Sequence, residues 1–270
     1  HGVREILIED DTFVIVKERV RAFCEELIAA RLDLSWSCLG RADRVDAELL
    51  KLMRRAGCWH ISYGIESGDP EILTAMHKHI DLDQIRQAVA WSRAAGLRTK
   101  GFFIVGFPRE SAASLRKTRE LACALPLDDI SVMQMTPFPG SELYAIAGDL
   151  GTFDRDWRHM NSVDTVFMPT GFTRADMEAA RAGMIRAFYL RPGMLVRHAW
   201  FWLRNPRILR RLLGGAGGIL RMLWPARRDK PPSRDSCQNH RLNMDKAAEA
   251  RRPPGDVNQT CGNKRMEGGG

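Results

Sequence analysis

The stretch TKGFFIVGFPRES, residues 99–111, decides the fold class. Its apolar run predicts a buried strand over 99–106, and the Gly-Phe-Pro that closes it predicts a turn. Ser111 is a residue type that starts helices, and a helical pattern continues from it to 124. Strand, turn and helix in this order form the repeating unit of a parallel α/β sheet.

Four more strands are predicted in the first 150 residues, with helical patterns in the gaps. Asp46 is a further helix-start residue, while Gly57 and Gly96 follow helix ends, where a left-handed backbone is easiest for glycine. Five consecutive strand–helix units favour a partial TIM-like (βα) barrel over a doubly wound sheet. The expected strands are 5–9, 33–39, 59–65 and 129–135, and the expected helices are 16–31, 46–56, 83–95 and 111–124, with a short turn near 69–77.

Polar or turn-forming residues follow the carboxyl end of each predicted strand. In a barrel these ends converge on one face, where the active site lies, so the separated segments predict one site. The alternative for each segment is local: an acid that caps the next helix or turn, or a turn that simply leaves a strand. In chain order the residues are Asp10 and Asp11, Arg41, Glu66 and Ser67, Gly106 and Pro108, and Pro137 and Pro139.

Charge is unevenly distributed along the chain, whose net charge is +8. Residues 1–193 hold 25 basic and 27 acidic residues, while 194–224 hold six Arg and no acid. The basic surplus therefore belongs to the C-terminal part, and we expect no nucleic-acid partner for the rest.

The six cysteines lie far apart, with no C-x-x-C spacing, which indicates reduced thiols in the cytoplasm rather than a disulfide framework or a zinc site. The sequence also lacks the glycine-rich and serine motifs of common nucleotide-binding proteins and hydrolases. Because the chain starts with His1 directly before a strand, we interpret it as part of a longer protein.

The pattern changes after residue 150. Segments 153–161 and 167–173 are expected to be irregular, and Thr173 is expected to cap a helix over 174–190, so that 151–193 forms a C-terminal subdomain. Residues 194–224 predict basic amphipathic helices without an apolar run long enough to span a membrane. Two interpretations of them stay open: a cap packed on the barrel, or an anchor on anionic lipid. The tail, 225–270, has the composition of a disordered segment.

Taken together, the segments 41–58, 63–73, 99–111 and 136–144 resemble the radical S-adenosylmethionine (SAM) family. The resemblance is closest to its cobalamin-dependent branch, which includes anaerobic magnesium-protoporphyrin IX monomethyl ester cyclases, and it covers about residues 1–195.

The resemblance implies a role for each residue at the strand ends. Asp10 and Asp11 match the acids that bind the ammonium group of SAM, and Arg41 matches a position suited to its carboxylate. Glu66 matches the acid that accepts hydrogen bonds from the ribose hydroxyls. Beside it, Ser67 and Gly68 are expected to leave room for the ligand. Glu110 is expected to be a first-turn acid of its helix. The residues expected to flank the adenine are Gly106, Pro108, Pro137 and Pro139.

The family's chemistry needs a C-x-x-x-C-x-x-C motif that holds a [4Fe-4S] cluster, and this sequence has none. We therefore expect the cluster ligands, and a cobalamin domain, upstream of His1, and we expect this chain alone to be inactive. The implied activity is methyl transfer or oxidative cyclisation on a small-molecule substrate such as a tetrapyrrole or lipid. Flavodoxin or ferredoxin is the implied electron donor. If residues 194–224 form the lipid anchor rather than the cap, they are the contact with the inner membrane face.

Two other functions stay open from the residues alone. One is a barrel that lacks catalysis and serves as a binding or scaffolding module. The other is a TIM-barrel lyase that places Asp10, Asp11 and Glu66 on a divalent cation.

Overall fold

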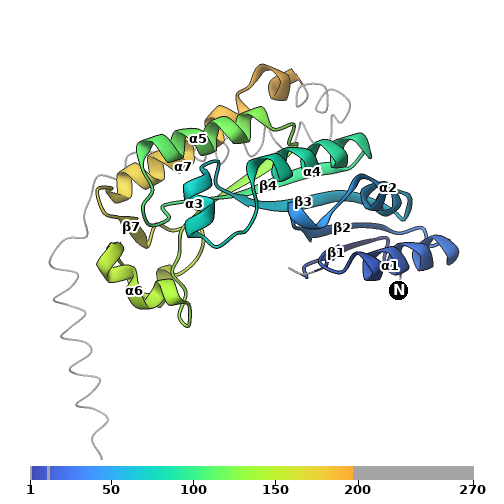
Figure 1. The fold of residues 1–270 in the computed structure, drawn as a ribbon, viewed down its shortest axis with the longest axis horizontal. Helices are drawn as coiled ribbons and strands as arrows, with labels where there is room; N and C mark the ends of the chain where they lie inside the picture. Colours follow the sequence, from blue (N-terminus) through green and yellow to red (C-terminus); the bar gives the residue numbers. More distant parts are fainter. Residues whose placement is uncertain (1, 11–12, 197–270) are drawn as a thin grey trace, which may run out of the picture. The chain divides into compact units, whose positions relative to one another are not determined.

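Five parallel strands form one sheet that curls into half of a barrel (Figure 1). This computed structural model describes residues 2–10 and 13–196. The strands lie side by side in chain order, as expected for successive strand–helix units, and their ends differ from the prediction by at most two residues. The predicted partial barrel is therefore confirmed. Its strands are β1 (Glu5–Ile8), β2 (Ser35–Gly40), β3 (Cys58–Glu66), β4 (Arg98–Val105) and β5 (Asp129–Gln134).

The four helices predicted between the strands begin and end within two residues of the expected bounds, and a further short helix, α3 (Pro70–Ala75), lies where a turn was predicted. The side chain of Asp46 accepts a hydrogen bond from the backbone of Leu49, and Ser111 forms a capping box. Gly57 and Gly96, which follow two of the helices, have φ angles of +95° and +80°. The connecting helices are α1 (Lys17–Ala29), α2 (Ala47–Arg55), α3 (Pro70–Ala75), α4 (Leu82–Ala94) and α5 (Ala112–Ala124).

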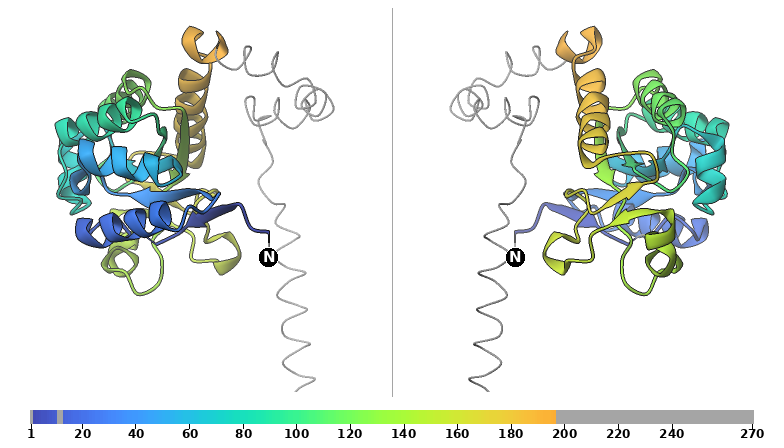
Figure 2. Two further views of the ribbon diagram at one scale, coloured as in Figure 1. Left: turned by 90° about the vertical axis from the view of Figure 1, so that its right-hand side faces the viewer. Right: turned by 90° about the vertical axis from the view of Figure 1, so that its left-hand side faces the viewer.

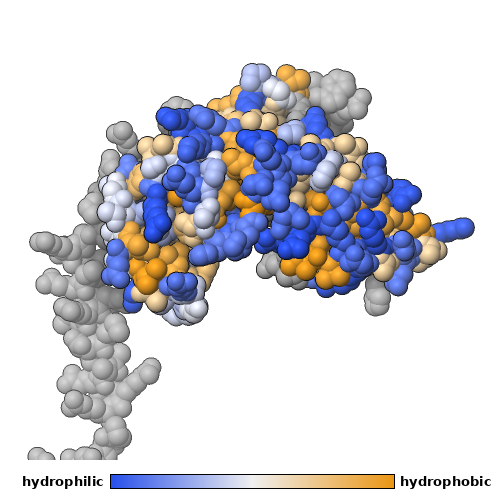
Figure 3. Space-filling view, in the orientation of Figure 1, coloured by the Kyte–Doolittle hydropathy of each residue, from blue (hydrophilic) through white to orange (hydrophobic). Residues whose placement is uncertain are grey.

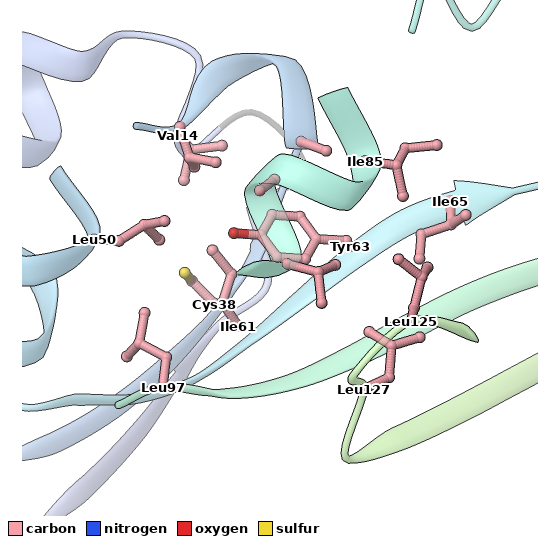
Figure 4. Packing of buried hydrophobic residues seen from close by; sticks show 14 of the residues in the cluster. Val14, Cys38, Leu50, Ile61, Tyr63, Ile65, Ile85, Leu97, Leu125 and Leu127 are labelled. Carbon is pink, nitrogen blue, oxygen red and sulfur yellow. The ribbon is translucent and has the colours of Figure 1, made fainter. Parts of the chain in front are cut away.

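The core lies between the sheet and the helices, and Figure 4 shows side chains from both. Tyr63 is fully buried at its centre, where its hydroxyl is 2.7 Å from that of Ser92, and burial raises its pKa. Burial also raises the pKa of Cys24 to about 12. A hydrogen bond with Cys58, together with burial, raises the pKa of Cys38. These thiols are therefore protonated at neutral pH and serve as small core residues.

The part of the chain after β5 differs from the prediction. Segments 153–161 and 167–173 were expected to be irregular, but strands β6 (Gly151–Phe153) and β7 (Phe167–Pro169) form an antiparallel pair. Helix α6 (Glu142–Leu150), which precedes them, was not predicted, and it lies apart from the other helices (Figure 1). Strands of three residues are too short to show a period of two, so they cannot be predicted from the alternation of apolar and polar residues.

Helix α7 (Arg174–Tyr189) begins at the predicted cap, Thr173, and packs along the outer edge of β5. Arg181 donates a hydrogen bond from Nε to the backbone carbonyl of Val132, at 2.8 Å. The hydroxyl of Tyr189 lies 3.3 Å from the carbonyl of Ile130. These contacts occupy backbone acceptors that an edge strand otherwise leaves open. Figure 2 shows α7 from both sides.

The described residues belong to one compact unit, residues 1–225. The predicted subdomain 151–193 stays a prediction. Within 194–224, Met194 is buried, whereas residues from 197 onward and the predicted disordered tail, 225–270, lie outside the described residues. Among residues 2–10 and 13–196, no helix is long and apolar enough to cross a membrane.

Candidate functional site

A cavity of about 340 Å³ lies at the carboxyl ends of β2 and β3 and is also lined by residues of β4 and β5. It brings together two of the residues predicted from sequence, Arg41 and Glu66. It also includes Lys78, from the loop between α3 and α4, which the sequence did not indicate. The rest of the lining is small or apolar: Leu39, Gly40, Ser62, Gly64, Phe102 and Met133.

Glu66 and Lys78 form an ion pair inside this cavity. The Nζ atom of Lys78 is 2.5 Å from Oε1 of Glu66, and the two side chains are only 22% and 14% exposed. Glu66 lies where the pairing of β3 with β4 shifts register. Its φ angle is +66°, which is unfavourable for a residue with a Cβ. Gly64 makes the pair possible, because a Cβ there would lie 2.6 Å from Oε1 of Glu66 and 2.9 Å from Nζ of Lys78.

Arg41 is held by Asp43, a second residue that was not predicted from the sequence. Its Nε and one terminal nitrogen donate to the two carboxylate oxygens of Asp43, at 3.0 and 3.1 Å. The same terminal nitrogen is 3.4 Å from the backbone carbonyl of Lys78. The side chain of Asp43 is 11% exposed and also pairs with Arg44. The Arg-x-Asp spacing just after a strand is the signal that could have identified this pair.

Glu110 fastens the turn that follows β4. Its Oε2 accepts hydrogen bonds from the backbone N–H groups of Gly106, at 2.5 Å, and Phe107, at 3.3 Å. Glu110 was predicted to be a first-turn acid of α5, which is wrong, because it precedes the cap Ser111 and bonds backward to the turn. Burial raises its pKa to about 7, and its Oε1 is buried without a hydrogen-bond partner.

The small residues after Glu66 pack against α5. Ser67 is fully buried, and its hydroxyl is 3.1 Å from that of Thr118. A Cβ on Gly68 would lie 2.5 Å from the carbonyl oxygen of Lys117 and 2.7 Å from Cα of Thr118. The space left by Gly68 is therefore filled by a helix and not by a ligand, while the SAM contact of Ser67 stays a prediction.

The remaining predicted residues lie elsewhere. Asp10 is half exposed and lies 3.6 Å from Arg19, and it lines neither this cavity nor the second cavity described next. Asp11 lies outside the described residues. Gly106, at the start of the turn after β4, has a φ of +90° and is buried. Pro137 is buried and Pro139 exposed, and neither lines these two cavities. Their contacts with SAM stay predictions.

A second, larger cavity of about 710 Å³ lies beside the turn that Glu110 fastens. Pro108 is the predicted residue that lines it. The walls come from the end of α3, from the turns after β4 and β5, and from α6. Figure 3 shows hydrophobic surface gathered over α6.

The side chains of the described residues suit SAM better than they suit an iron–sulfur cluster. The acids and cations around the first cavity suit the hydroxyl and carboxylate groups of SAM. An iron–sulfur cluster needs several thiolates, and among the described residues no group of three or more His, Cys, Asp or Glu could hold a metal ion. Since the three buried thiols are also small core residues, the described part of the chain does not fit the cluster.

A family model and two relatives place this chain near the same group of proteins. Residues 1–122 match the model of the Radical SAM superfamily. An uncharacterized methyltransferase from Pyrococcus horikoshii is 33% identical over 199 residues, 73% of this chain and 43% of that protein. An anaerobic magnesium-protoporphyrin IX monomethyl ester cyclase from Rubrivivax gelatinosus is 28% identical over 198 residues, 72% of this chain and 35% of that protein.

A solved structure shares the fold. The radical S-adenosylmethionine methyltransferase TsrM from Kitasatospora setae, with tryptophan substrate and a SAM analog bound, superposes with a TM-score of 0.54. The identity is 16%, and the match covers 68% of this chain and 42% of that one. The chain thus spans less than half the length of each of these three proteins.

Proposed function

We propose that this chain, which belongs to the radical SAM superfamily, forms the SAM-binding part of a radical SAM enzyme. The observation that carries the proposal is the cavity in which Arg41, Glu66 and Lys78 meet at the carboxyl ends of β2 and β3. A carboxylate and two cations in one partly buried space are complementary to a ligand with hydroxyl groups and its own carboxylate.

Glu66 and Lys78 are paired with each other in this cavity. A ligand that binds either of them must therefore replace the other as its partner. When a ribose donates its hydroxyls to Glu66, the ammonium of Lys78 is released and can join Arg41 in binding the carboxylate of the same ligand. Arg41 stays fixed by Asp43, which orients its guanidinium toward the cavity. Asp10 and Asp11 are proposed for the ammonium group of SAM, as the sequence resemblance implies.

In the whole protein, a [4Fe-4S] cluster held by residues outside the described part of this chain would supply radical chemistry to the bound SAM, with its electron coming from a reduced donor protein. The part that belongs to this chain is to hold and orient SAM. Because the relatives include methyltransferases and a cyclase, we propose methyl transfer or oxidative cyclisation of a small molecule for the whole protein. Cobalamin as second cofactor, and flavodoxin or ferredoxin as electron donor, belong to the same proposal.

Calorimetric titration of the full 270-residue chain with SAM tests the proposal. Glu66→Gln keeps the shape but removes the charge, and we expect the dissociation constant to rise about 5- to 150-fold, the effect of about 1–3 kcal/mol for a lost charged hydrogen bond. Glu71→Gln, an exposed acid five residues along on α3, is the matched control and should bind as the wild type.

A folded wild-type chain that does not bind SAM, or a Glu66→Gln variant with unchanged affinity, would contradict the proposal. Circular dichroism of each variant shows that a loss of binding does not come from unfolding.

A further inference from the structure

The second cavity has the size and lining of a small-molecule pocket. Its volume of about 710 Å³ lies within the range that such pockets usually occupy. Most of its lining is apolar, and two of these side chains, Phe138 and Ile146, are 49% and 42% exposed. They therefore leave apolar surface open to an incoming molecule. Other apolar contributors are Met76, Phe107, Met135 and Leu143.

Arg109 is the cation of this cavity that the fold does not explain. Within the described residues its guanidinium makes no hydrogen bond or ion pair, although it lines the cavity. Its backbone is held at a φ of +69°, between Pro108 and the buried Glu110, whose bonds to Gly106 and Phe107 fasten the turn. The turn thus holds the backbone of an exposed arginine, whose guanidinium has no partner among the described residues, beside apolar walls.

The other ionisable groups of the lining have local explanations. Glu142 lies in the first turn of α6, where the helix dipole favours a negative charge. The ring of His77 lies against that of His79, at 6.4 Å between centroids. Of the three, Arg109 therefore points most directly to a ligand group, and that group must be an anion placed away from Glu142.

We infer that the second cavity is the substrate pocket, and that it takes an apolar molecule whose anionic group, a carboxylate or a phosphate, is bound by Arg109. The term substrate rests on the proposed function, since His77 of this cavity is the chain neighbour of Lys78, which lines the proposed SAM site. The cavity and the first one have no lining residue in common. If SAM is confined to the first cavity, the two ligands should bind together, and Pro108 then contacts the apolar ligand instead of the adenine of SAM.

Two fluorescent probes with the same aromatic skeleton test the pocket on the full chain. 1-Anilinonaphthalene-8-sulfonate carries an anion, and N-phenyl-1-naphthylamine is its neutral counterpart. Arg109→Asn removes the cation and keeps a residue that tolerates a left-handed backbone. We expect this variant to bind the sulfonate at least 5-fold more weakly and the neutral probe as before, with partial recovery in Arg109→Lys. Arg86→Gln, an exposed arginine on α4, is the matched control and should change neither affinity.

A second variant tests the apolar walls. Ile146→Trp fills the cavity from α6 and should weaken both probes, whereas the melting temperature should change little because Ile146 is 42% exposed. Dodecanoate and dodecyl phosphate then compete with the bound sulfonate. Displacement by one of them identifies the anionic group, and displacement by dodecanol at the same concentration would overturn the role of the anion.

The inference and the proposed function fail in different ways. Equal effects of Arg109→Asn on both probes would overturn the role of Arg109 while leaving the SAM titration intact. Displacement of the sulfonate by SAM would assign this cavity to SAM and overturn its role as a separate substrate pocket. Probe binding without SAM binding would contradict the proposed function alone.

Discussion

The ammonium of Lys78 lies 2.5 Å from the carboxylate of Glu66, across the cavity at the end of β3. Lys78 reaches this place from a loop in which both of its neighbours, His77 and His79, have left-handed φ angles of 52° and 49°. Such conformations are uncommon for residues with a Cβ and persist when the surroundings fix them. The pair therefore joins two strained segments of the chain.

The first prediction concerns this pair. Lys78→Met leaves the carboxylate of Glu66 partly buried without its cation, so the free energy of unfolding should fall by about 1–3 kcal/mol. In the double variant with Glu66→Gln, part of the loss should be recovered, because no unpaired charge remains. Urea denaturation of the single and double variants measures the coupling.

Lys51→Met is the matched control for this pair. Lys51 and Glu48 form an exposed pair on α2, with side chains 58% and 73% exposed, and such a pair contributes at most about 1 kcal/mol. If Lys78→Met costs no more than Lys51→Met, the cavity does not protect its ion pair from water.

The second prediction concerns the pH dependence of stability. The pKa of Glu110 is raised from 4.5 to about 7 by burial, so the folded state binds the proton more tightly than the unfolded state. The stabilisation is fully present below pH 4.5 and is lost as the pH rises to about 7. The wild-type chain should lose on the order of 3 kcal/mol over this window from this group.

Glu110→Gln should remove this dependence. The amide oxygen can still accept from Gly106 and Phe107, and the amide nitrogen takes the place of the oxygen that has no partner. The variant should therefore match the wild type near pH 5 and exceed it near pH 8 in urea denaturation. A variant as pH-dependent as the wild type, or less stable at pH 8, would show that the Glu110 carboxylate is ionised in the folded state.

The third prediction compares two glycines. Gly68→Ala places a Cβ against the backbone of α5, at 2.5 Å from the carbonyl oxygen of Lys117, and rigid backbone cannot move aside cheaply. It should lower the free energy of unfolding by about 1–3 kcal/mol.

At Gly183, in the interior of α7, nothing lies within 4 Å of an added Cβ. Gly183→Ala should therefore raise the stability by about 0.5–1 kcal/mol. The melting temperature should rise from Gly68→Ala through the wild type to Gly183→Ala. Equal melting temperatures for the two variants would contradict the packing argument.

The sequence predicted the sheet more completely than the site. The strands and the caps at Asp46 and Ser111 could be predicted because apolar runs and cap residues are local signals. The ion pair of Glu66 with Lys78 could not, because the two residues are 12 positions apart and meet only through a left-handed loop. The role of Glu110 was missed because a backward bond to a turn has the same sequence pattern as an acid before a helix.

The last prediction concerns Asp43, which holds Arg41 without lining the first cavity. If Arg41 binds the carboxylate of SAM, Asp43 acts as a positioning residue. Asp43→Asn keeps the shape and one acceptor oxygen, but it removes the charge that fixes both guanidinium bonds. We expect the dissociation constant for SAM to rise about 3- to 10-fold, an effect of about 1 kcal/mol. Calorimetric titration measures it.

Two comparisons separate positioning by Asp43 from a general loss of structure. Asp83→Asn changes an acid of α4 that is 93% exposed and pairs with Arg86, and it should leave the affinity unchanged. Arg41→Lys keeps the cation but loses the forked geometry, so it should weaken SAM binding as much as Asp43→Asn does, and combining the two should add little. Fully additive effects would mean that Asp43 acts on SAM binding by a route other than Arg41.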